Sequence, residues 1–491
     1  MFRKFLIVTT LGVFAPVAHA QPSAPAAAAP QVFTLAEALQ FAVDHYPAVK
    51  AAVEQVNASA ASVGVAKAAY LPRLDGVWQT NRATVNNVTG LLLPQSIIPS
   101  ISGPPPATTS SASTWGSAAG ALFSWEVYDF GVRGAGVHSA EAAVTRARAD
   151  ETLTRLEVQR AVGVAFLAVV QAEQAVTAAA ADLERRTVLA RAARTLADNE
   201  LRPGAEASRA DAERAAADTR LIQARQALTL AQTTLARVLG STAGSVRINA
   251  ASLLAAAMPS SVPVSAGGAG SDASAAGQAR ASGAAPAVPP AHPLIEARQA
   301  AIDVARAQEE AIATANRPRL LLQSSIFARG SGAAFNGTLE GGADGLWPER
   351  ANWAGGVQVV FPDLFGFSSV RARRAAAAAS TRAETARREE AVLAVTAEQQ
   401  AAAAMIEAAR AVAANTPVQL AAARQTETQA SARFQAGLGT IVEVADAQNL
   451  LAQAEYQDAA AKVDVWRAML ADAIAQGDLA PFVRLATEGV R

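Results

Sequence analysis

The sequence contains one pattern written twice, and this duplication restricts the possible folds more than any other feature. Three blocks recur in the same order: 33–74 with 292–320, 125–144 with 361–380, and 202–213 with 435–447. Pro47 matches Pro293, and Gly204 matches Gly437. Repetition over such distances indicates two structural units with the same order of elements, which must pack together to bury their apolar faces.

The ends and the middle of the chain differ from the repeats in composition. The first residues contain Arg3 and Lys4, then an apolar run, then Ala18-His19-Ala20, which is typical of a cleaved secretory signal. Ala, Gly, Ser and Pro dominate the middle, which indicates a linker. The predicted division is 1–20 signal peptide, 21–34 N-terminal segment, 35–250 first repeat, 251–290 linker, 291–477 second repeat and 478–491 C-terminal tail.

Each repeat has the order helix, hairpin, long helix, turn, helix. The predicted helices are 35–71, 131–202 and 205–239 in the first repeat and 294–317, 367–435 and 440–476 in the second. Apolar residues recur every seven positions in the first long helix, at Val162, Val169, Val176, Leu183 and Ala190, with companions at Ala165, Ala172 and Ala179. This spacing indicates coiled-coil packing. The two shorter helices together match the long one in length, so we expect them to lie end to end beside it.

The hairpins at about 74–128 and 320–361 show the alternation of β-strands. Soluble hairpins also use aromatic residues, but secretion and the lack of an uninterrupted apolar run favour interfacial girdles of a membrane barrel, built from Trp78, Trp115, Trp125 and Trp353. Four strands cannot close a barrel, and open strand edges are not tolerated in lipid. We therefore expect several chains to contribute strands, with three chains giving twelve.

Composition and motifs argue against several other classes of protein. The formal net charge is +0, so a nucleic-acid coat is not expected, and the chain has no cysteine for thiolate metal sites or disulfides. His45, His138 and His292 lack ligand spacing, and no clustered catalytic set is visible. We therefore predict no enzyme activity, no cofactor and no metal site.

Three stretches carry a resemblance to a known family. "FTLAEALQFAVDHYPAVKAA", "SWEVYDFGVRGAGVHSAEAAV" and "ARFQAGLGTIVEVADAQNLLAQAEYQ" resemble the TolC-type outer-membrane factor family, and the similarity extends over about 32–477. It implies a mainly α fold with a β-barrel portion: a homotrimer with a twelve-stranded barrel in outer-membrane lipid and a periplasmic helical tunnel. It also implies docking through a periplasmic adaptor (membrane fusion) protein to an inner-membrane pump of the RND or ABC type. Drug efflux, metal efflux and type I protein secretion would use the same duct.

Two turns lie at the end of the repeats remote from the hairpins. Gly204 and Gly437 are predicted to end helices there. In the family these turns form the periplasmic tip that the adaptor contacts, which implies that role for Pro203, Gly204, Gly437, Leu438 and Gly439.

Three carboxylates follow these turns. Glu443 and Asp446 lie three residues apart at the start of a helix, where acidic residues are stabilising by about 0.3–1 kcal/mol each. The resemblance implies a second role, in which they ring the closed aperture of a trimer. Glu213 is the counterpart of Asp446 in the first repeat, whereas Ala210 replaces Glu443.

A secreted coiled-coil structural or adaptor protein without a barrel is the alternative to an export channel. Its hairpins would be soluble, and the protein would be a periplasmic monomer. A secreted hydrolase would need a catalytic cluster that the sequence does not contain.

Overall fold

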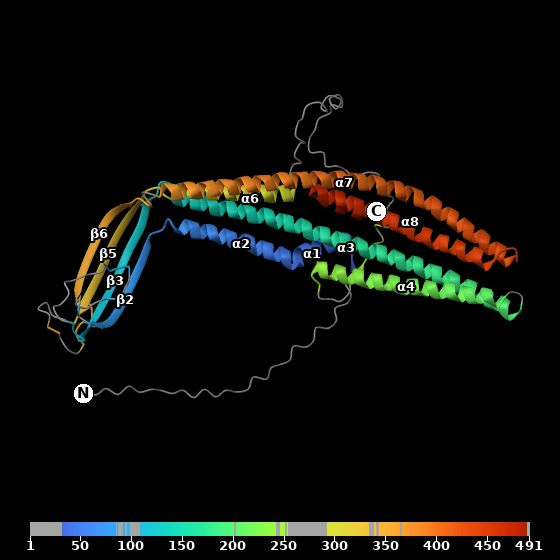
Figure 1. Ribbon diagram of the computed structural model, residues 1–491, viewed down its shortest axis with the longest axis horizontal. Coiled ribbons are helices and arrows are strands. Elements are labelled where there is room, and N and C mark those ends of the chain that lie inside the picture. Colours follow the sequence, from blue (N-terminus) through green and yellow to red (C-terminus); the bar gives the residue numbers. More distant parts are fainter. Residues whose placement is uncertain are drawn as a thin grey trace, which may run out of the picture.

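The computed structural model describes residues 32–84, 86, 92–93, 96–98, 109–200, 203–241, 246–250, 253, 292–332, 338–339, 343–363 and 366–488. A four-stranded sheet forms one end of the elongated molecule, and helical hairpins extend from it to a distant tip (Figure 1). The predicted signal peptide lies outside the described residues, as does most of the predicted linker.

The first repeat contains two helices, a strand hairpin and two further helices. Its elements are β1 (Val32–Phe33), α1 (Leu35–His45), α2 (Pro47–Ala68), β2 (Arg73–Thr84), β3 (Ser113–Tyr128), α3 (Val132–Asp198), α4 (Gly204–Leu239) and β4 (Arg247–Ile248). The second repeat lacks a counterpart of α1 among its described residues. It comprises α6 (Pro293–Thr314), β5 (Arg319–Ser331), β6 (Arg350–Val360), α7 (Phe367–Gln435) and α8 (Ile441–Gln476), followed by α9 (Ala480–Glu488).

The sheet has the order β2-β3-β5-β6, and every neighbouring pair is antiparallel. The pairing of β3 with β5 therefore joins the two repeats, while β2 and β6 are edge strands. The register places Trp78 and Trp353 on one side of the sheet, together with Phe123 and Ile326. We call this side the apolar face. Trp78, Ile326 and Trp353 remain 60%, 63% and 83% exposed on it.

The opposite side of the sheet, which we call the polar face, carries mostly uncharged polar and small side chains. It includes Asp75, Gln79, Gly120, Ser124, Gln323, Ser325, Arg329, Asn352 and Gln358, and also a few larger apolar residues, Val77, Leu122, Leu321 and Phe327. An exposed apolar face backed by a polar one is the alternation found in transmembrane strands.

The long helix α3 occupies the centre of the helical part. It packs against α2, α4, α6 and α8, and its seven-residue repeat is buried at Val162, Val169 and Ala190. One stretch of α3 is long and apolar enough to cross a membrane by length and composition. Its contacts with α1, α2, α4, α6 and α8 account for that apolar character within the helical bundle.

The shorter helices meet end to end beside the long ones, as the sequence predicts. Gly240 ends α4 with a φ of 72° and lies against Tyr46 and Pro47 at the start of α2. Gly477 ends α8 with a φ of 77° and lies against His292 and Pro293 at the start of α6. A left-handed glycine lets each helix end tightly against the next.

The predicted continuous helix at 35–71 is wrong in one respect. It is interrupted at Tyr46, which has extended backbone angles, and a new helix starts at Pro47. Proline restricts the preceding residue to extended conformations and is well suited to the first position of a helix. The break lets α1 turn away and contact α9, so that Leu39 joins a core that also contains Trp466 and Phe482.

A buried ion pair fixes the passage from β3 into α3. The Asp129 carboxylate accepts hydrogen bonds from the backbone N–H of Gly131 (3.1 Å) and of Arg133 (2.5 Å), and from Nε of Arg133 (3.0 Å). Burial works to raise the pKa of Asp129, but these hydrogen bonds and the Arg133 charge hold it below its usual value. Arg133 also donates to the carbonyl oxygen of Glu126 (2.6 Å), which ties the helix to the strand.

Candidate functional site

The candidate site is the tip, where the α3–α4 and α7–α8 hairpins turn (Figure 1). In the second repeat, Gly437 adopts a φ of 77°, and the N–H groups of Leu438 and Gly439 donate to the carbonyl oxygen of Arg433 (2.9 and 3.1 Å). These bonds satisfy carbonyl groups that the end of α7 would leave unpaired. Leu438 is 75% exposed at the apex.

The first-repeat turn is built differently. Among the described residues of this turn, Glu200 adopts a left-handed backbone, with a φ of 57°. Gly204 is the first residue of α4 and Pro203 precedes it as the N-cap, so the prediction that Gly204 ends a helix is wrong. The residue that occupies the place of Gly437 in the first-repeat turn is therefore Glu200, two residues after α3 ends, just as Gly437 lies two residues after α7 ends.

Glu443 and Asp446 are both exposed in the first turns of α8. Thr440 caps the N-terminus of α8 through Glu443. The backbone N–H of Glu443 donates to the Thr440 hydroxyl (3.3 Å), and that hydroxyl donates to Oε1 of Glu443 (3.4 Å). Its Oε2 lies 3.9 Å from Nε of Arg433 on the preceding helix. Asp446 makes no salt bridge within the described part of the chain, so its charge is available to solvent and ions.

Glu213 lies in a different environment from the other two carboxylates. Its Oε2 accepts a hydrogen bond from Nη1 of Arg186 (2.8 Å), and Arg186 is only 1% exposed. Arg186 also donates from Nε to Asp182 (2.9 Å) and from Nη2 to Oδ1 of Asn449 (2.7 Å). The structure therefore joins Glu213 to a buried network that links α3, α4 and α8.

The Arg186 network was missed in the sequence, although a signal for it exists. Ala165, Ala172 and Ala179 occupy one companion position of the seven-residue repeat, and the next residue in that series is Arg186. An arginine in a seam otherwise filled by alanine requires partners, because a buried charge without them is costly. Two further pairs flank it: Arg220 with Asp182 (3.1 Å) and Arg185 with Glu455 (2.8 Å).

A small apolar core closes the tip beyond this network. Phe434, Ile441 and Val444 of the second repeat pack with Ala190 and Ala193 of the first.

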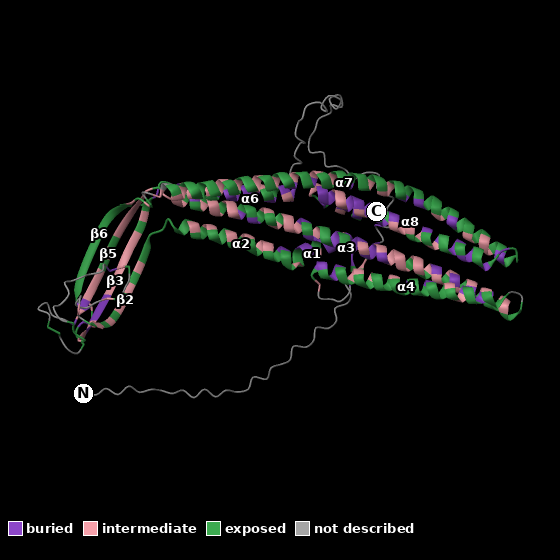
Figure 2. Ribbon diagram, viewed as in Figure 1, coloured by how far each residue is buried: buried purple, intermediate pink, exposed green. Residues whose placement is uncertain are grey.

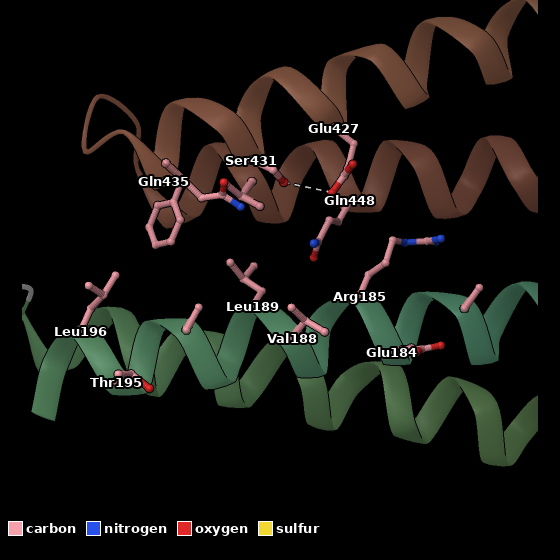
Figure 3. A pocket seen from close by; sticks show the side chains of 14 residues that line it. Glu184, Arg185, Val188, Leu189, Thr195, Leu196, Glu427, Ser431, Gln435 and Gln448 are labelled. Carbon is pink, nitrogen blue, oxygen red and sulfur yellow. Dashed lines mark hydrogen bonds between the residues drawn. The ribbon is translucent and has the colours of Figure 1, made fainter.

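Beside this core a groove of about 910 Å³ separates α3 from α7 and α8. Figure 3 shows Val188, Leu189 and Leu196 facing it from α3, with Gln435 and Gln448 on the opposite side. The two hairpins are thus joined by a narrow core and one ionic network, with open space between them.

The four predicted girdle tryptophans all lie on the sheet. Trp125 is at the end nearest the helices, where its Nε1 donates to the Tyr70 carbonyl oxygen (3.0 Å). Trp115 is near the opposite end, with the Arg82 guanidinium 5.7 Å from its ring centre. Trp78 and Trp353 are exposed on the apolar face between them. Their contact with membrane interfaces stays a prediction.

In the described parts of the chain, no three His, Asp or Glu side chains come together in a way that could hold a metal ion. The tip instead offers two kinds of carboxylate, exposed ones on α8 and a paired one on α4. Such an arrangement can attract cations and can hold two hairpins together.

Comparison with known proteins now identifies the fold and the family. No curated protein sequence matches the chain. The solved outer-membrane channel OprN is 18% identical over 90% of this chain and 89% of its own, with a TM-score of 0.66. VceC from Vibrio cholerae is 17% identical over 90% and 96%, with a TM-score of 0.66, and CmeC from Campylobacter jejuni is 14% identical over 90% and 85%, with a TM-score of 0.67.

The family model described as "Outer membrane efflux protein" matches residues 38–241 and 290–471. These segments cover most of both predicted repeats, and the resemblance to the TolC-type family is confirmed. The protein is placed in the outer membrane, with a large periplasmic helical portion. The chain belongs to the outer membrane efflux protein family.

Proposed function

We propose that three copies of the chain form a passive export duct, with a twelve-stranded barrel and a helical tunnel. The observation that supports this most directly is the joint between the repeats. Within one chain, β3 pairs with β5, and α3 packs against α6 and α8, so the first repeat is completed by the second.

The second repeat lacks the equivalent neighbour. Strand β6 has an open edge, and among the described elements α7 packs mainly against α6 and α8, with Phe434 reaching the first repeat at the tip. Strand β2 and helices α2 and α4 of another copy are the elements that would fill this place by the symmetry of the repeats. Repeating one such contact around an axis generates a closed ring, and closure removes the strand edges that lipid does not tolerate.

In this assembly the two tip turns would contact a partner protein. We propose that Pro203, Gly204, Gly437, Leu438 and Gly439 contact a periplasmic adaptor, which couples the duct to an inner-membrane pump of the RND or ABC type for efflux or type I secretion. Exposed Leu438 supplies an apolar contact at the apex.

We propose that Glu443 and Asp446 form two rings of three carboxylates around the aperture, with Glu213 behind them. Asp446 supplies the stronger field, since Arg433 lies beside Glu443 and Arg186 compensates Glu213. Like charges gathered on an axis attract multivalent cations and repel one another.

Planar bilayers test the ring. Hexaamminecobalt added on the periplasmic side should block the wild-type channel, and Glu443→Ala combined with Asp446→Ala should weaken the block by about tenfold or more. Glu407→Ala, which removes an exposed carboxylate from α7, should leave the block unchanged. Equal block of the double variant and the wild type would reject the ring.

The alternative is a secreted coiled-coil protein without a barrel. Fractionation separates the two possibilities, because an export duct appears as a heat-modifiable trimer in the outer-membrane fraction. A soluble periplasmic monomer would overturn the duct.

A further inference from the structure

We propose that the groove between α3 and the α7–α8 hairpin at the tip binds an amphipathic organic cation. The ligand is a small molecule with an apolar body, a hydrogen-bond donor and a carbonyl-type acceptor. Because residues of a single chain line the groove, this inference does not depend on the proposed trimer.

The size and the apolar lining of the groove suit a small molecule. Its volume of about 910 Å³ falls among the values of about 300–1,000 Å³ that are typical of ligand pockets. Val188, Leu189 and Leu196 face it from α3 (Figure 3), and Val188 is 61% exposed. Phe434 and Val444 line the groove as well, although both are mostly buried in the small core at the tip. An apolar ligand would cover Val188 and gain from the removal of apolar surface from water.

Gln448 gives the most direct indication of a ligand. It lines the groove and is only 4% exposed, yet its Oε1 accepts no hydrogen bond from the described part of the chain. Figure 3 shows its amide pointing from α8 toward α3. A buried acceptor without a donor is unfavourable. The last torsion of a glutamine side chain is soft, so a small rotation presents Oε1 to a donor held in the groove.

Arg185 offers a donor on the opposite wall. Its Nη1 and Nη2 donate to the carboxylate of Glu455 (3.4 and 2.8 Å), but its buried Nε finds no acceptor among the described residues. A ligand that carries both a donor and an acceptor would therefore satisfy polar atoms on both sides of the groove.

The charges in the lining favour a cation. Glu184 and Glu427 both line the groove, and within the described part of the chain neither forms an ion pair. Glu427 accepts a hydrogen bond from the Ser431 hydroxyl (3.0 Å), which leaves its charge in place. The guanidinium in the lining is already paired, and the exposed Arg191 and Arg424 are not lining residues. The groove therefore attracts cations more than anions.

A ligand in this position would lie between the two tip hairpins. It would touch α3 of the first repeat and both α7 and α8 of the second, which are otherwise joined here by the small core and the Arg186 network. Binding should therefore slow amide hydrogen exchange in both hairpins.

Doxorubicin is a suitable probe, because it is a fluorescent apolar cation with an ammonium donor and carbonyl acceptors. Fluorescence polarisation with the full chain in a nonionic detergent should show saturable binding. N-acetyldoxorubicin, which lacks the charge, should bind at least about fivefold more weakly. Gln448→Leu should raise the Kd for doxorubicin about fivefold through the loss of one hydrogen bond, and Glu427→Gln should raise it to a similar extent.

Two further variants complete the test. Gln453→Leu is the matched control, because Gln453 is an exposed glutamine of α8 outside this groove, and its affinity should equal that of the wild type. Val188→Trp fills part of the groove from an exposed position, so it should raise the Kd more than about tenfold without unfolding the chain.

Two results would overturn the site. One is equal affinity of the wild type, Gln448→Leu and Val188→Trp, and the other is a wild type without saturable binding, which would show that the groove holds only water. Both results would leave the proposed duct in place. Conversely, a chain that binds doxorubicin but forms no conducting channel in planar bilayers would overturn the duct and leave the site.

Discussion

The two long helices, α3 and α7, are products of the same duplicated pattern and have nearly the same length, yet they are buried very differently. Helix α3 has 67 residues and α7 has 69. Figure 2 shows α3 as a mixture of buried, intermediate and exposed residues, whereas most of α7 is exposed. The difference follows from their neighbours, because α3 packs along helices of both repeats, whereas the main contacts of α7 among the described elements are with α6 and α8 of its own repeat.

Duplication of the sequence therefore determines the secondary-structure elements of each repeat more strongly than it determines the neighbours against which those elements pack. Each repeat forms a hairpin of one long and one shorter helix. The interface between the two repeats, where α3 packs against α6 and α8, occurs only once in a chain. Chemistry that needs several helices, such as the Arg186 network, can therefore form around α3. The corresponding part of α7 carries a simpler contact, a hydrogen bond from buried Thr416 to Asp458 (3.0 Å).

The largest effect is expected from removing the centre of the α3 network. Arg186→Ala leaves Asp182 and Glu213 without their shared partner, and breaking a buried ion pair from one side costs about 3–5 kcal/mol. Guanidinium chloride unfolding in detergent should show a clearly lower midpoint. Arg424→Ala, at an exposed position of α7, should change the free energy of unfolding by less than about 0.5 kcal/mol. Similar losses in both variants would contradict the contrast between the helices.

A second, smaller effect is expected where strands pass into the long helices. Asp129 is buried and accepts three hydrogen bonds, whereas Asp363, at the passage from β6 into α7, is exposed and accepts one long hydrogen bond from Ser369 (3.4 Å). Asp129→Asn removes charged acceptors from Arg133 and should lower the free energy of unfolding by about 1–3 kcal/mol, and Asp363→Asn should have little effect.

The pH dependence of this contribution has a definite sign. The pKa of Asp129 is lower in the folded protein than its usual value of about 3.9, so folding favours the ionised form. The stability that Asp129 adds is fully present above about pH 4 and is lost as the pH falls through the folded pKa. The advantage of the wild type over Asp129→Asn should therefore shrink in acid. A constant difference between pH 7 and pH 3 would exclude this assignment.

Much of this architecture follows from local sequence signals. These signals are local in the sequence. They are the seven-residue repeat of α3, the alternation in the strand hairpins and the matching prolines, and they predict the helices, the apolar and polar faces of the sheet, and the end-to-end stacking of the shorter helices. Family membership could also be predicted from the sequence, because each stretch that resembles the family is continuous. Helix α7 begins and ends at the predicted residues.

Other features depend on contacts between distant parts of the chain. Arg186 meets Glu213 and Asn449, which are 27 and 263 residues away, and no periodicity pairs such positions. The first-repeat turn was misjudged because Glu200, a residue type that seldom adopts a positive φ, takes the left-handed conformation there. Closure of the proposed barrel would depend on strands from other copies, so it cannot be read from the four strands of one chain.

The smallest effects should come from the two tip glycines, and they should have opposite signs. Gly437 has a φ of 77°, where a side chain costs about 1–2 kcal/mol, so Gly437→Ala should destabilise the α7–α8 hairpin. Gly204 is the first residue of α4, and an added Cβ would meet nothing within 4 Å. Gly204→Ala should therefore stabilise the α3–α4 hairpin by about 0.4–1 kcal/mol, because alanine loses less backbone entropy on folding. Amide hydrogen exchange at the two tips measures both changes, and a loss of protection in both variants would show that the turns need glycine for the same reason.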